Sequence, residues 1–504
     1  MSDTALQRRE VTGSNTTVAG LGRRARATLL RTSVAAGVVY LGVAAYALLF
    51  VLAAVLHYVE FKTGRFDNGD MVQAIWNTLH GRFLETTSLA GQQSSRLGAH
   101  VDPFLLLFAP LFWISSSPLL LPVVQALAVA SGALPVYWLA RKHLGSSRAS
   151  AQFVFAYLLY PATQFNAFTN AVGFHSVSMA VPLVLYALWF LDEDRLVAFS
   201  VMAVLAASTK EEMPLAVGCL GIWYAVRKGG RRFGLGVFAV GLGLTFFNFL
   251  WVIPHFSPSG ANPFAGRYVA VGGTPRGMAH KLVTDPMAFV HAVATGHKAT
   301  FLALLLVPFL GLWLLEPLVM LGAVPDLVIN LLSGKSEQTT ISYQYAAGIV
   351  PFVVAASIFG AARFKRQSGR LSLWVLTAVA CTAIYSPILV LIKDVPALGA
   401  PVTAAQTRAL DLIPDGAPVS ASNLLGGYLS ERPYIATFPY VGRARWIIVD
   451  ANDQSYGTKA QARAAGIYLD FRRTLRRYET SQAWRIIFTS RGVTVLRRRA
   501  NTAS

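Results

Sequence analysis

The sequence predicts a mainly α-helical, polytopic membrane protein that ends in a small α/β domain. Of its 504 residues, 54% are hydrophobic and only 13% are charged, and the mean hydropathy is +0.49. Soluble globular proteins carry about 25% charged residues, so lipid is the expected solvent for most of this chain. The long apolar runs stop near residue 393, and alternating strand and helix signals follow. This change of texture predicts the second domain.

The first spanning helix is expected at the apolar run from Val34 to Leu56, which is too long for the core of a cleavable signal peptide. Residues 1–33 carry six arginines against one Asp and one Glu. The positive-inside rule therefore predicts a basic cytoplasmic tail, and it places residues 57–102 in a large first outer loop. Much of the formal net charge of +20 lies in such short loops, which argues against nucleic acid as a partner.

Further apolar runs predict a transmembrane bundle over residues 34–393, with about eleven spans in all. Pro103 to Trp113 is too short to cross, and we expect a re-entrant or interfacial segment there. Phe301 to Leu332 is expected to make two passes broken at Glu316-Pro317, because two passes put the basic residues 363–370 inside. The other expected spans are 119–140, 151–167, 177–191, 196–209, 213–226, 234–253, 345–362 and 371–392.

Residues 394–504 are then expected outside the membrane as an α/β domain. Val402 to Leu412 predicts a helix, and the segments APVSAS and ARWIIVD predict strands. WRIIFTS followed by GVTVLRR is typical of a β-hairpin. The domain is rich in arginine, so a basic face either rests on anionic lipid headgroups or is simply a soluble surface.

Polar residues near the ends of the expected spans fall mostly on the outer side. Ionisable groups at membrane depth are costly to bury and are therefore candidates for function. With this topology they could meet in one cavity that opens outward. The candidates are Asp67, Asp70, His100 and Asp102 in the first outer loop, His175 before the fourth span, Lys210, Glu211 and Glu212 in a turn between two apolar helices, and Tyr345 before the tenth span.

These residues also have structural interpretations. Asp70 could be the N-cap of an amphipathic helix that starts at Met71, and His175 could cap a span. Asp102 could be an ordinary loop residue before a proline. Lys210 could extend its amine to the interface. The two carboxylates that follow it favour an ion-pair network or a ligand site instead.

Several segments, in this order, resemble the membrane family of domain of unknown function 2079. They are FDNGDMVQAIWNTLHGRF, LGAHVDPFLLLFAPLFW, YPATQFNAFTNAVGFHSVSMAVPL, KEEMPLAVG and TISYQYAAGIVPFVVAA. The resemblance extends over most of the chain, and only Asn68 and Val101 depart from the family pattern at these motifs. The family name assigns no function. Its architecture remotely resembles the GT-C class of polytopic glycosyltransferases, which use polyprenyl-phosphate sugars as donors.

This second resemblance implies a multi-pass plasma-membrane enzyme that transfers a sugar to an envelope acceptor on the outer face. Asp70 is the favoured general base, with Asp67 as its neighbour. Lys210 would stabilise the departing lipid phosphate, held by Glu211 or Glu212. The remaining expected substrate-binding residues are His100, His175 and Tyr345. A divalent metal such as Mn²⁺ or Zn²⁺ is a further option, with Asp70, His100, Asp102 and His175 as its possible ligands.

Two other functions fit the same cavity. A transporter or lipid flippase would use it for alternating access, although no internal repeat is evident. A non-catalytic cell-envelope assembly protein is the other alternative. The sequence contains no phosphate-cradling GxxxxGK[ST], no GxSxG and no HExxH, which argues against cytosolic nucleotide-driven chemistry.

Overall fold

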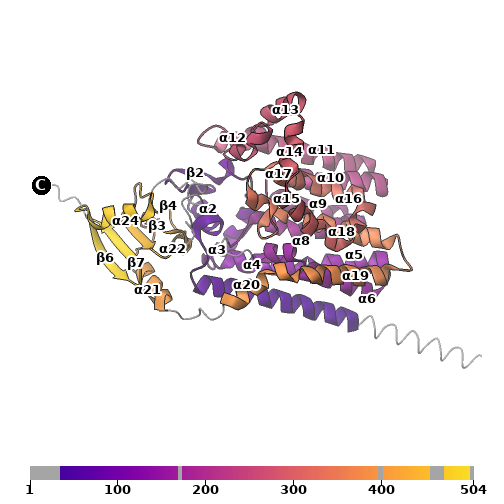
Figure 1. Cartoon of the computed structure of the whole chain (residues 1–504), viewed down its shortest axis with the longest axis horizontal. Coiled ribbons are helices and arrows are strands. Elements are labelled where there is room, and N and C mark those ends of the chain that lie inside the picture. Colours follow the sequence, from indigo (N-terminus) through magenta and orange to yellow (C-terminus); the bar gives the residue numbers. More distant parts are fainter. Residues whose placement is uncertain (1–33, 169–172, 395–400, 454–469, 500–504) are drawn as a thin grey trace, which may run out of the picture.

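The computed structural model describes residues 34–168, 173–394, 401–453 and 470–499. Helices fill one side of the molecule and a β-sheet domain lies at the other, as Figure 1 shows. Helix α2 (Asp70–Leu79) and strand β2 (Gln93–Ser95) lie between the two parts. The predicted fold class, mainly helical with a small sheet at the C-terminal end, is confirmed at this level.

Four helices are long and apolar enough to cross a membrane, and a bent pair would be a fifth such span. The four are Val34–Val59, Leu120–Leu144, Arg231–Phe256 and Ser368–Leu389. The bent pair is Met287–Val293 with Gly296–Phe309, at an angle of 64°. Most other predicted spans coincide with shorter helices, so the total of about eleven stays a prediction.

The labelled helices follow the predicted segments closely. From the second span to the ninth they are α4 (Leu120–Ser131), α5 (Ala133–Leu144), α6 (Ser147–Leu159), α7 (Pro161–Ala167), η4 (Ser176–Met179), α8 (Ala180–Asp192), α9 (Leu196–Ala207), α10 (Met213–Arg227), α11 (Arg231–Phe247), η5 (Asn248–Val252), α12 (Ile253–Phe256), η6 (Ala265–Val271), α13 (Pro275–Thr284), α14 (Met287–Val293), α15 (Gly296–Leu306), η7 (Val307–Phe309), η8 (Leu312–Leu315), α16 (Pro317–Met320), η9 (Leu321–Ala323) and α17 (Val324–Leu332). They are followed by η10 (Ser336–Thr339), η11 (Gln344–Ala346), α18 (Val350–Ala362), α19 (Ser368–Cys381), η12 (Thr382–Tyr385) and α20 (Pro387–Asp394). The predicted break at Glu316-Pro317 is confirmed, because α16 begins at Pro317.

Helices α10 and α11 pack closely through glycines. A Cβ atom on Gly221 would lie 2.3 Å from the carbonyl oxygen of Gly234, and one on Gly241 would lie 2.3 Å from that of Pro214. Small residues of this kind let membrane helices approach at backbone distance. The close packing of α10 holds the turn before it, which carries Lys210, in a defined place.

The first loop is a folded unit and not a linker. Its elements are η1 (Arg65–Gly69), α2, β1 (Glu85–Thr87), β2 and η2 (Arg96–Gly98), followed by η3 (Pro103–Phe108) and α3 (Ala109–Phe112). The predicted amphipathic helix is confirmed, and it buries Met71, Val72 and Ile75. The N-cap interpretation of Asp70 is wrong: Gly69 precedes the helix, Asp70 is its first residue, and no side chain caps it.

The C-terminal domain is a mixed five-stranded sheet with the strand order β4-β3-β5-β7-β6. Its elements are α21 (Pro401–Leu410), β3 (Val419–Ala421), α22 (Asn423–Gly427), β4 (Ile435–Thr437), β5 (Trp446–Asp450), α24 (Phe471–Glu479), β6 (Trp484–Ser490) and β7 (Val493–Arg498). β3 pairs in parallel with β4 and β5, whereas β7 pairs antiparallel with β5 and β6. The predicted first helix, two strands and hairpin are all present.

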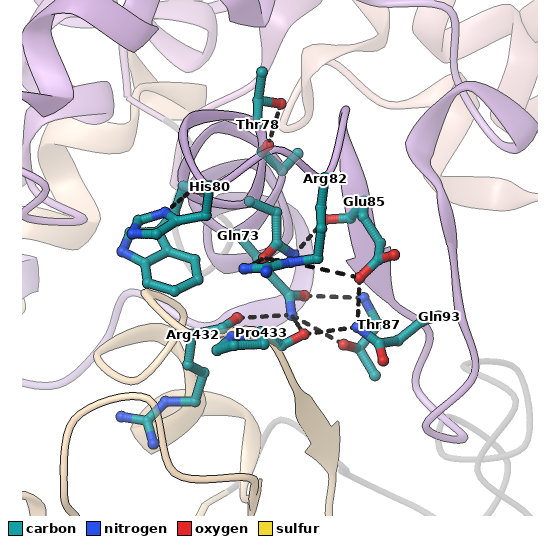
Figure 2. Close-up of polar contacts among 12 residues, drawn as sticks. Gln73, Thr78, His80, Arg82, Glu85, Thr87, Gln93, Arg432 and Pro433 are labelled. Atoms are coloured by element: carbon teal, nitrogen blue, oxygen red, sulfur yellow. Dashed lines mark hydrogen bonds and ion pairs between the residues drawn. The ribbon is translucent and has the colours of Figure 1, made fainter.

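The β4 edge of this sheet is docked on the first loop. Gln73 of α2 donates hydrogen bonds to the carbonyl oxygens of Arg432 (3.2 Å) and Pro433 (3.3 Å), which precede β4. The same amide bonds Thr87 of β1 in both directions, at 2.9 Å each. Figure 2 shows Gln73 at the centre of this network. The loop that carries Asp67 and Asp70 is therefore fixed both by contacts within itself and by contacts with the sheet domain.

At the opposite end of the helical part, the predicted cytoplasmic turns meet in ion pairs. The carboxylate of Asp192 lies 2.8 Å from Lys142 Nζ and 3.7 Å from Lys228 Nζ. Glu316 lies 2.8 Å from Arg227 and 3.3 Å from Arg363. The acidic turn after α8 and the basic turns therefore share one end, as the topology predicted. Which side of the membrane this end faces stays a prediction.

Candidate functional site

A polar cavity of about 270 Å³ lies where the first loop covers the helical part. Asp70, His100, His175 and Lys210 line this one cavity, although they come from distant parts of the sequence. The remaining polar residues of its wall are Asp67, Arg96, Asp102, Ser176, Thr209, Arg267, Lys335, Gln344 and Tyr345. The expectation that the outer-face candidates converge on one cavity is met for these residues.

Asp67 faces the cavity in a strained backbone conformation. Its φ of 65° and ψ of −76° are rare for any residue with a side chain, and such strain collects at functional sites. The carboxylate is 41% exposed to the cavity, and its Oδ2 lies 3.4 Å from Nε2 of His175. Burial raises the pKa of Asp67, but His175, Arg96 and His100 outweigh burial and lower the pKa to about 2. Asp67 is therefore an ionised carboxylate at neutral pH.

Asp70, three residues after Asp67, has a different partner. Its Oδ1 lies 3.2 Å from the guanidinium of Arg65, which is fully buried. Arg65 also donates to the Thr437 hydroxyl of β4 (2.6 Å) and to the carbonyl oxygen of Thr87. Burial raises the pKa of Asp70, and Arg65 and Arg96 offset only part of that rise. Asp70 thus connects the cavity to the sheet domain through Arg65.

Arg96 and Asp102 form a buried ion pair in the wall of the cavity. Arg96 Nε lies 3.0 and 2.9 Å from the two carboxylate oxygens, and the hydroxyl of Ser176 donates to Oδ2 at 3.1 Å. The side chains are 10% and 3% exposed. Burial raises the pKa of Asp102 in spite of Arg96. This geometry assigns Asp102 to positioning Arg96, which in turn presents positive charge to Asp67.

The turn between α9 and α10 contributes Lys210, Glu211 and Glu212. Glu211 accepts a hydrogen bond from the backbone N–H of Val101 at 3.1 Å, and it lies 3.1 Å from Nδ1 of His100. Glu212 pairs with the ammonium group of Lys210. Glu211 therefore anchors the first loop and orients His100, while Lys210 extends into the cavity.

A second, larger cavity of about 440 Å³ adjoins the first. Five residues line both cavities and form their junction: His100, Lys210, Phe264, Arg267 and Tyr345. Most other residues of the second cavity are apolar, among them Phe249, Leu250, Met278, Val328, Ile329 and Leu332. Leu250 and Val328 are 60% and 47% exposed. In a membrane protein such exposed apolar side chains face lipid, so we expect the second cavity to open toward lipid.

Arg96, Arg267 and Phe264 are site residues that the sequence analysis did not single out. Arg267 stacks on Phe264, with its guanidinium carbon 4.1 Å from the ring centre. A signal was available for both arginines, because the positive-inside rule disfavours arginine in short outer loops. An arginine in a predicted outer loop is therefore itself a candidate for function.

The possible metal ligands are not assembled as a metal site in this structure. Within the described residues, no three His, Cys, Asp or Glu side chains are placed to bind one ion. Asp102 is engaged by Arg96, His175 faces Asp67, and His100 faces Glu211. A role for a divalent metal therefore stays a prediction.

Comparisons with known proteins place the sequence among membrane proteins. The profile of a family described as "Predicted membrane protein (DUF2079)" matches residues 57–484. No curated protein matches the sequence. Among solved structures, ArnT from Cupriavidus metallidurans bound to undecaprenyl phosphate is similar, with 12% identity over 91% of this chain and 98% of that chain and a TM-score of 0.49.

Two further solved structures are also similar. ArnT in the apo state has 13% identity over 90% of this chain and 98% of that chain, with a TM-score of 0.48. The Archaeoglobus fulgidus oligosaccharyltransferase complex with Zn and sulfate has 14% identity over 84% of this chain and 70% of that chain, with a TM-score of 0.44.

Proposed function

The chain belongs to the DUF2079 family of predicted membrane proteins, and we propose that it is a glycosyltransferase that moves a sugar from a polyprenyl-phosphate donor to an envelope acceptor. The observation that carries the proposal is the junction of the two cavities. A polar chamber with an ionised carboxylate, Asp67, meets an apolar chamber at two cationic side chains, Lys210 and Arg267. A polyprenyl-phosphate sugar has a matching order: an apolar chain, then an anionic phosphate, then a polar sugar.

The apolar chamber suits the polyprenyl chain. Its lining side chains bury apolar surface, and each buried methylene group contributes about 0.8 kcal/mol to binding. Leu250 and Val328, which line the chamber, are also exposed on the surface of the helical part. A membrane lipid would enter sideways from the bilayer, with its headgroup toward Lys210.

The junction suits the phosphate. Lys210 and Arg267 would both contact phosphate oxygens, and their charge would stabilise the dianion that forms when the sugar leaves. Glu212 pairs with Lys210, and Phe264 stacks on Arg267, so both cations are preoriented. His100, held by Glu211, is a further hydrogen-bond partner at the same place.

The polar chamber suits the sugar and the acceptor hydroxyl. A general base must be ionised before it accepts the hydroxyl proton. Asp67 meets this condition, since its pKa is about 2 and its carboxylate is exposed to the cavity. Asp70 is engaged by Arg65. The sequence favoured Asp70 as the base with Asp67 as its neighbour; the contacts favour Asp67, with Asp70 holding the loop in place. The active chamber is proposed to face the extracytoplasmic side.

The test is sugar transfer by the purified full chain in lipid nanodiscs, using a panel of polyprenyl-phosphate sugars and envelope acceptors. Loss of a general base lowers rates by about 10²- to 10⁴-fold, which is the loss expected for Asp67→Asn, with a smaller loss for Asp70→Asn. Lys210→Met should raise KM for the lipid donor and lower kcat. Asp285→Asn and Lys281→Met are the matched controls, because these two residues form an exposed pair and line neither cavity.

Wild-type rates in Asp67→Asn and Asp70→Asn would remove the proposed catalytic role. Transport of the lipid across the bilayer without sugar transfer would overturn the proposal in favour of a flippase. An absence of both activities, with normal complementation of a deletion strain by the cavity variants, would leave a non-catalytic assembly protein.

A further inference from the structure

The last part of the sheet domain carries an unusual concentration of arginine. Residues 471–499 contain nine Arg, no Lys and a single acidic residue, Glu479. Arginine is the residue that binds phosphate through two parallel hydrogen bonds, because its planar guanidinium matches the phosphate oxygens. A surface that only needed solubility would not require arginine alone.

Two of these arginines face each other across the β6–β7 ladder. Arg485 is the direct cross-strand partner of Arg497 in the antiparallel pairing. Like charges directly opposite each other in a sheet are destabilising. Arg497 is further held beside β5, where its guanidinium carbon lies 5.3 Å from the ring centre of Trp446. The fold therefore keeps two cations side by side at a cost in stability.

Among the acidic side chains that the structure describes, none offsets this cost. Within the described residues, no ion pair involves Arg485, Arg497, Arg498 or Arg499. The stretches 454–469 and 500–504 contain no Asp or Glu in their sequence. An external anion is thus the natural partner of this cluster.

The cluster also has a shape that can hold a ligand. The four arginines and Ile487 line a cavity of about 440 Å³. Pockets of about 300–1,000 Å³ bury most of the surface of a drug-sized molecule. The volume therefore favours a ligand with several anionic groups over a single small ion.

The position of the cavity separates it from the membrane-facing part of the protein. The β4 edge docks on the first loop, whereas β6 forms the opposite edge of the sheet. Four strand spacings of about 4.8 Å place β6 about 19 Å beyond β4. Figure 1 shows β6 and β7 on the side of the sheet that lies away from the helices. Since the attraction of a charged lipid surface is screened within about 8–10 Å, headgroups of the same bilayer are poor candidates.

We propose that the β6–β7 edge is a binding site for a polymer with repeated phosphate groups, located in the aqueous compartment that the sheet domain faces. Arg485 and Arg497 bind adjacent phosphates from one face of the ladder, and Arg498 and Arg499 extend the site at its end. The inference stands apart from the sugar-transfer chemistry, because the site shares no residue with either cavity described above.

The experiment measures binding of fluorescently labelled polyphosphate to the full chain in nanodiscs of neutral phosphatidylcholine. The double variant Arg485→Gln/Arg497→Gln should weaken binding at least tenfold. The matched control is Arg472→Gln/Arg476→Gln, which removes the same charge from exposed positions of α24 that do not line the cavity. The control should change affinity less than threefold. Both double variants remove two positive charges from the domain, but the control removes none that line the cavity.

Two further arms identify the source of the phosphate. Unlabelled polyphosphate should compete, whereas inorganic phosphate and phosphatidylglycerol vesicles at equal phosphate concentration should not. Polyphosphate should also raise the thermal unfolding temperature of the wild type and of the control, but not of the cavity variant. Equal weakening in both double variants, or competition by the vesicles as strong as by the polymer, would overturn the proposal.

Discussion

His175 is the residue whose replacement tests the electrostatic account of the polar cavity most directly. Its Nε2 lies 3.4 Å from Asp67 Oδ2, and its backbone N–H donates to Gln125 at 2.7 Å. His175→Gln keeps the backbone contact and most of the volume but removes the imidazole. We expect the pKa of Asp67 to rise, because burial is then opposed only by Arg96 and His100.

The size of this rise follows from the contacts. The pKa of Asp67 is about 2 in the folded protein, against an ordinary value of 3.8. Removal of the imidazole, the largest of the opposing influences, should return it to about 4 or above, since a neighbouring charge lowers the pKa of an aspartate by about 1–3. The acid limb of the transfer rate should therefore move upward by about two pH units.

The same change has a readout that does not need activity. Because the folded-state pKa of Asp67 lies below the ordinary value, its ionisation stabilises the fold above about pH 4, and this stability is lost as the pH falls through about 2. In His175→Gln, where the folded-state pKa of Asp67 returns to its ordinary value or above it, this contribution should disappear. The free energy of unfolding should then be lower above about pH 4 and should fall less as the pH drops toward 2. His291→Gln, at an exposed position, is the control. An unchanged acid limb, together with an unchanged pH dependence of the unfolding free energy between about pH 4 and 2, would refute the reasoning.

Three other perturbations follow from the contacts. Arg96→Met should lower the unfolding free energy in detergent by about 3–5 kcal/mol, because it leaves Asp102 buried without its partner. In a double-mutant cycle with Asp102→Asn, additive losses of stability would show that the two side chains do not interact. Gln73→Ala should lower the free energy of unfolding by about 1–3 kcal/mol and speed hydrogen exchange in β4 but not in β6. If the amides of β4 were as well protected in the variant as in the wild type, the docking role of Gln73 would be refuted. Val328→Trp should fill the mouth of the apolar cavity and weaken polyprenyl-phosphate binding at least tenfold, with thermal unfolding unchanged; unaltered affinity would exclude that entry route.

The parts of the fold that could be predicted are those set by local pattern. The two successive strand-like segments WRIIFTS and GVTVLRR predicted the β6–β7 hairpin, and amphipathic spacing predicted α2. Strand β4 was missed because it has only three residues, all buried, which is too short to show an alternating pattern, and because it pairs in parallel with β3 and forms no hairpin. Helix α24 was missed because four of its nine residues are arginines and few are apolar, although Phe471, Leu475 and Tyr478 have helical spacing.

The candidate site shows a similar division. Residue type and predicted sidedness selected the acids and histidines of the cavity, which requires no knowledge of contacts. The strained conformation of Asp67 could not be predicted, because in the sequence Asp67-Asn68-Gly69 a left-handed backbone is expected at Asn or Gly first. Arg65 could not be assigned either, since its partner Thr437 lies 372 residues away.

The two ends of the helical part differ in how their buried polar groups are paired, and this difference distinguishes a structural ion pair from a candidate binding site. At one end Glu316 is neutralised by Arg227 and Arg363, so this carboxylate needs no ligand. At the other end, Nδ1 of His175 and Oε1 of Gln344 are buried in the wall of the polar cavity without a hydrogen-bond partner among the described residues. A buried polar atom left unpaired costs about 1–3 kcal/mol. A ligand in the polar cavity that pairs with these two atoms would recover this cost.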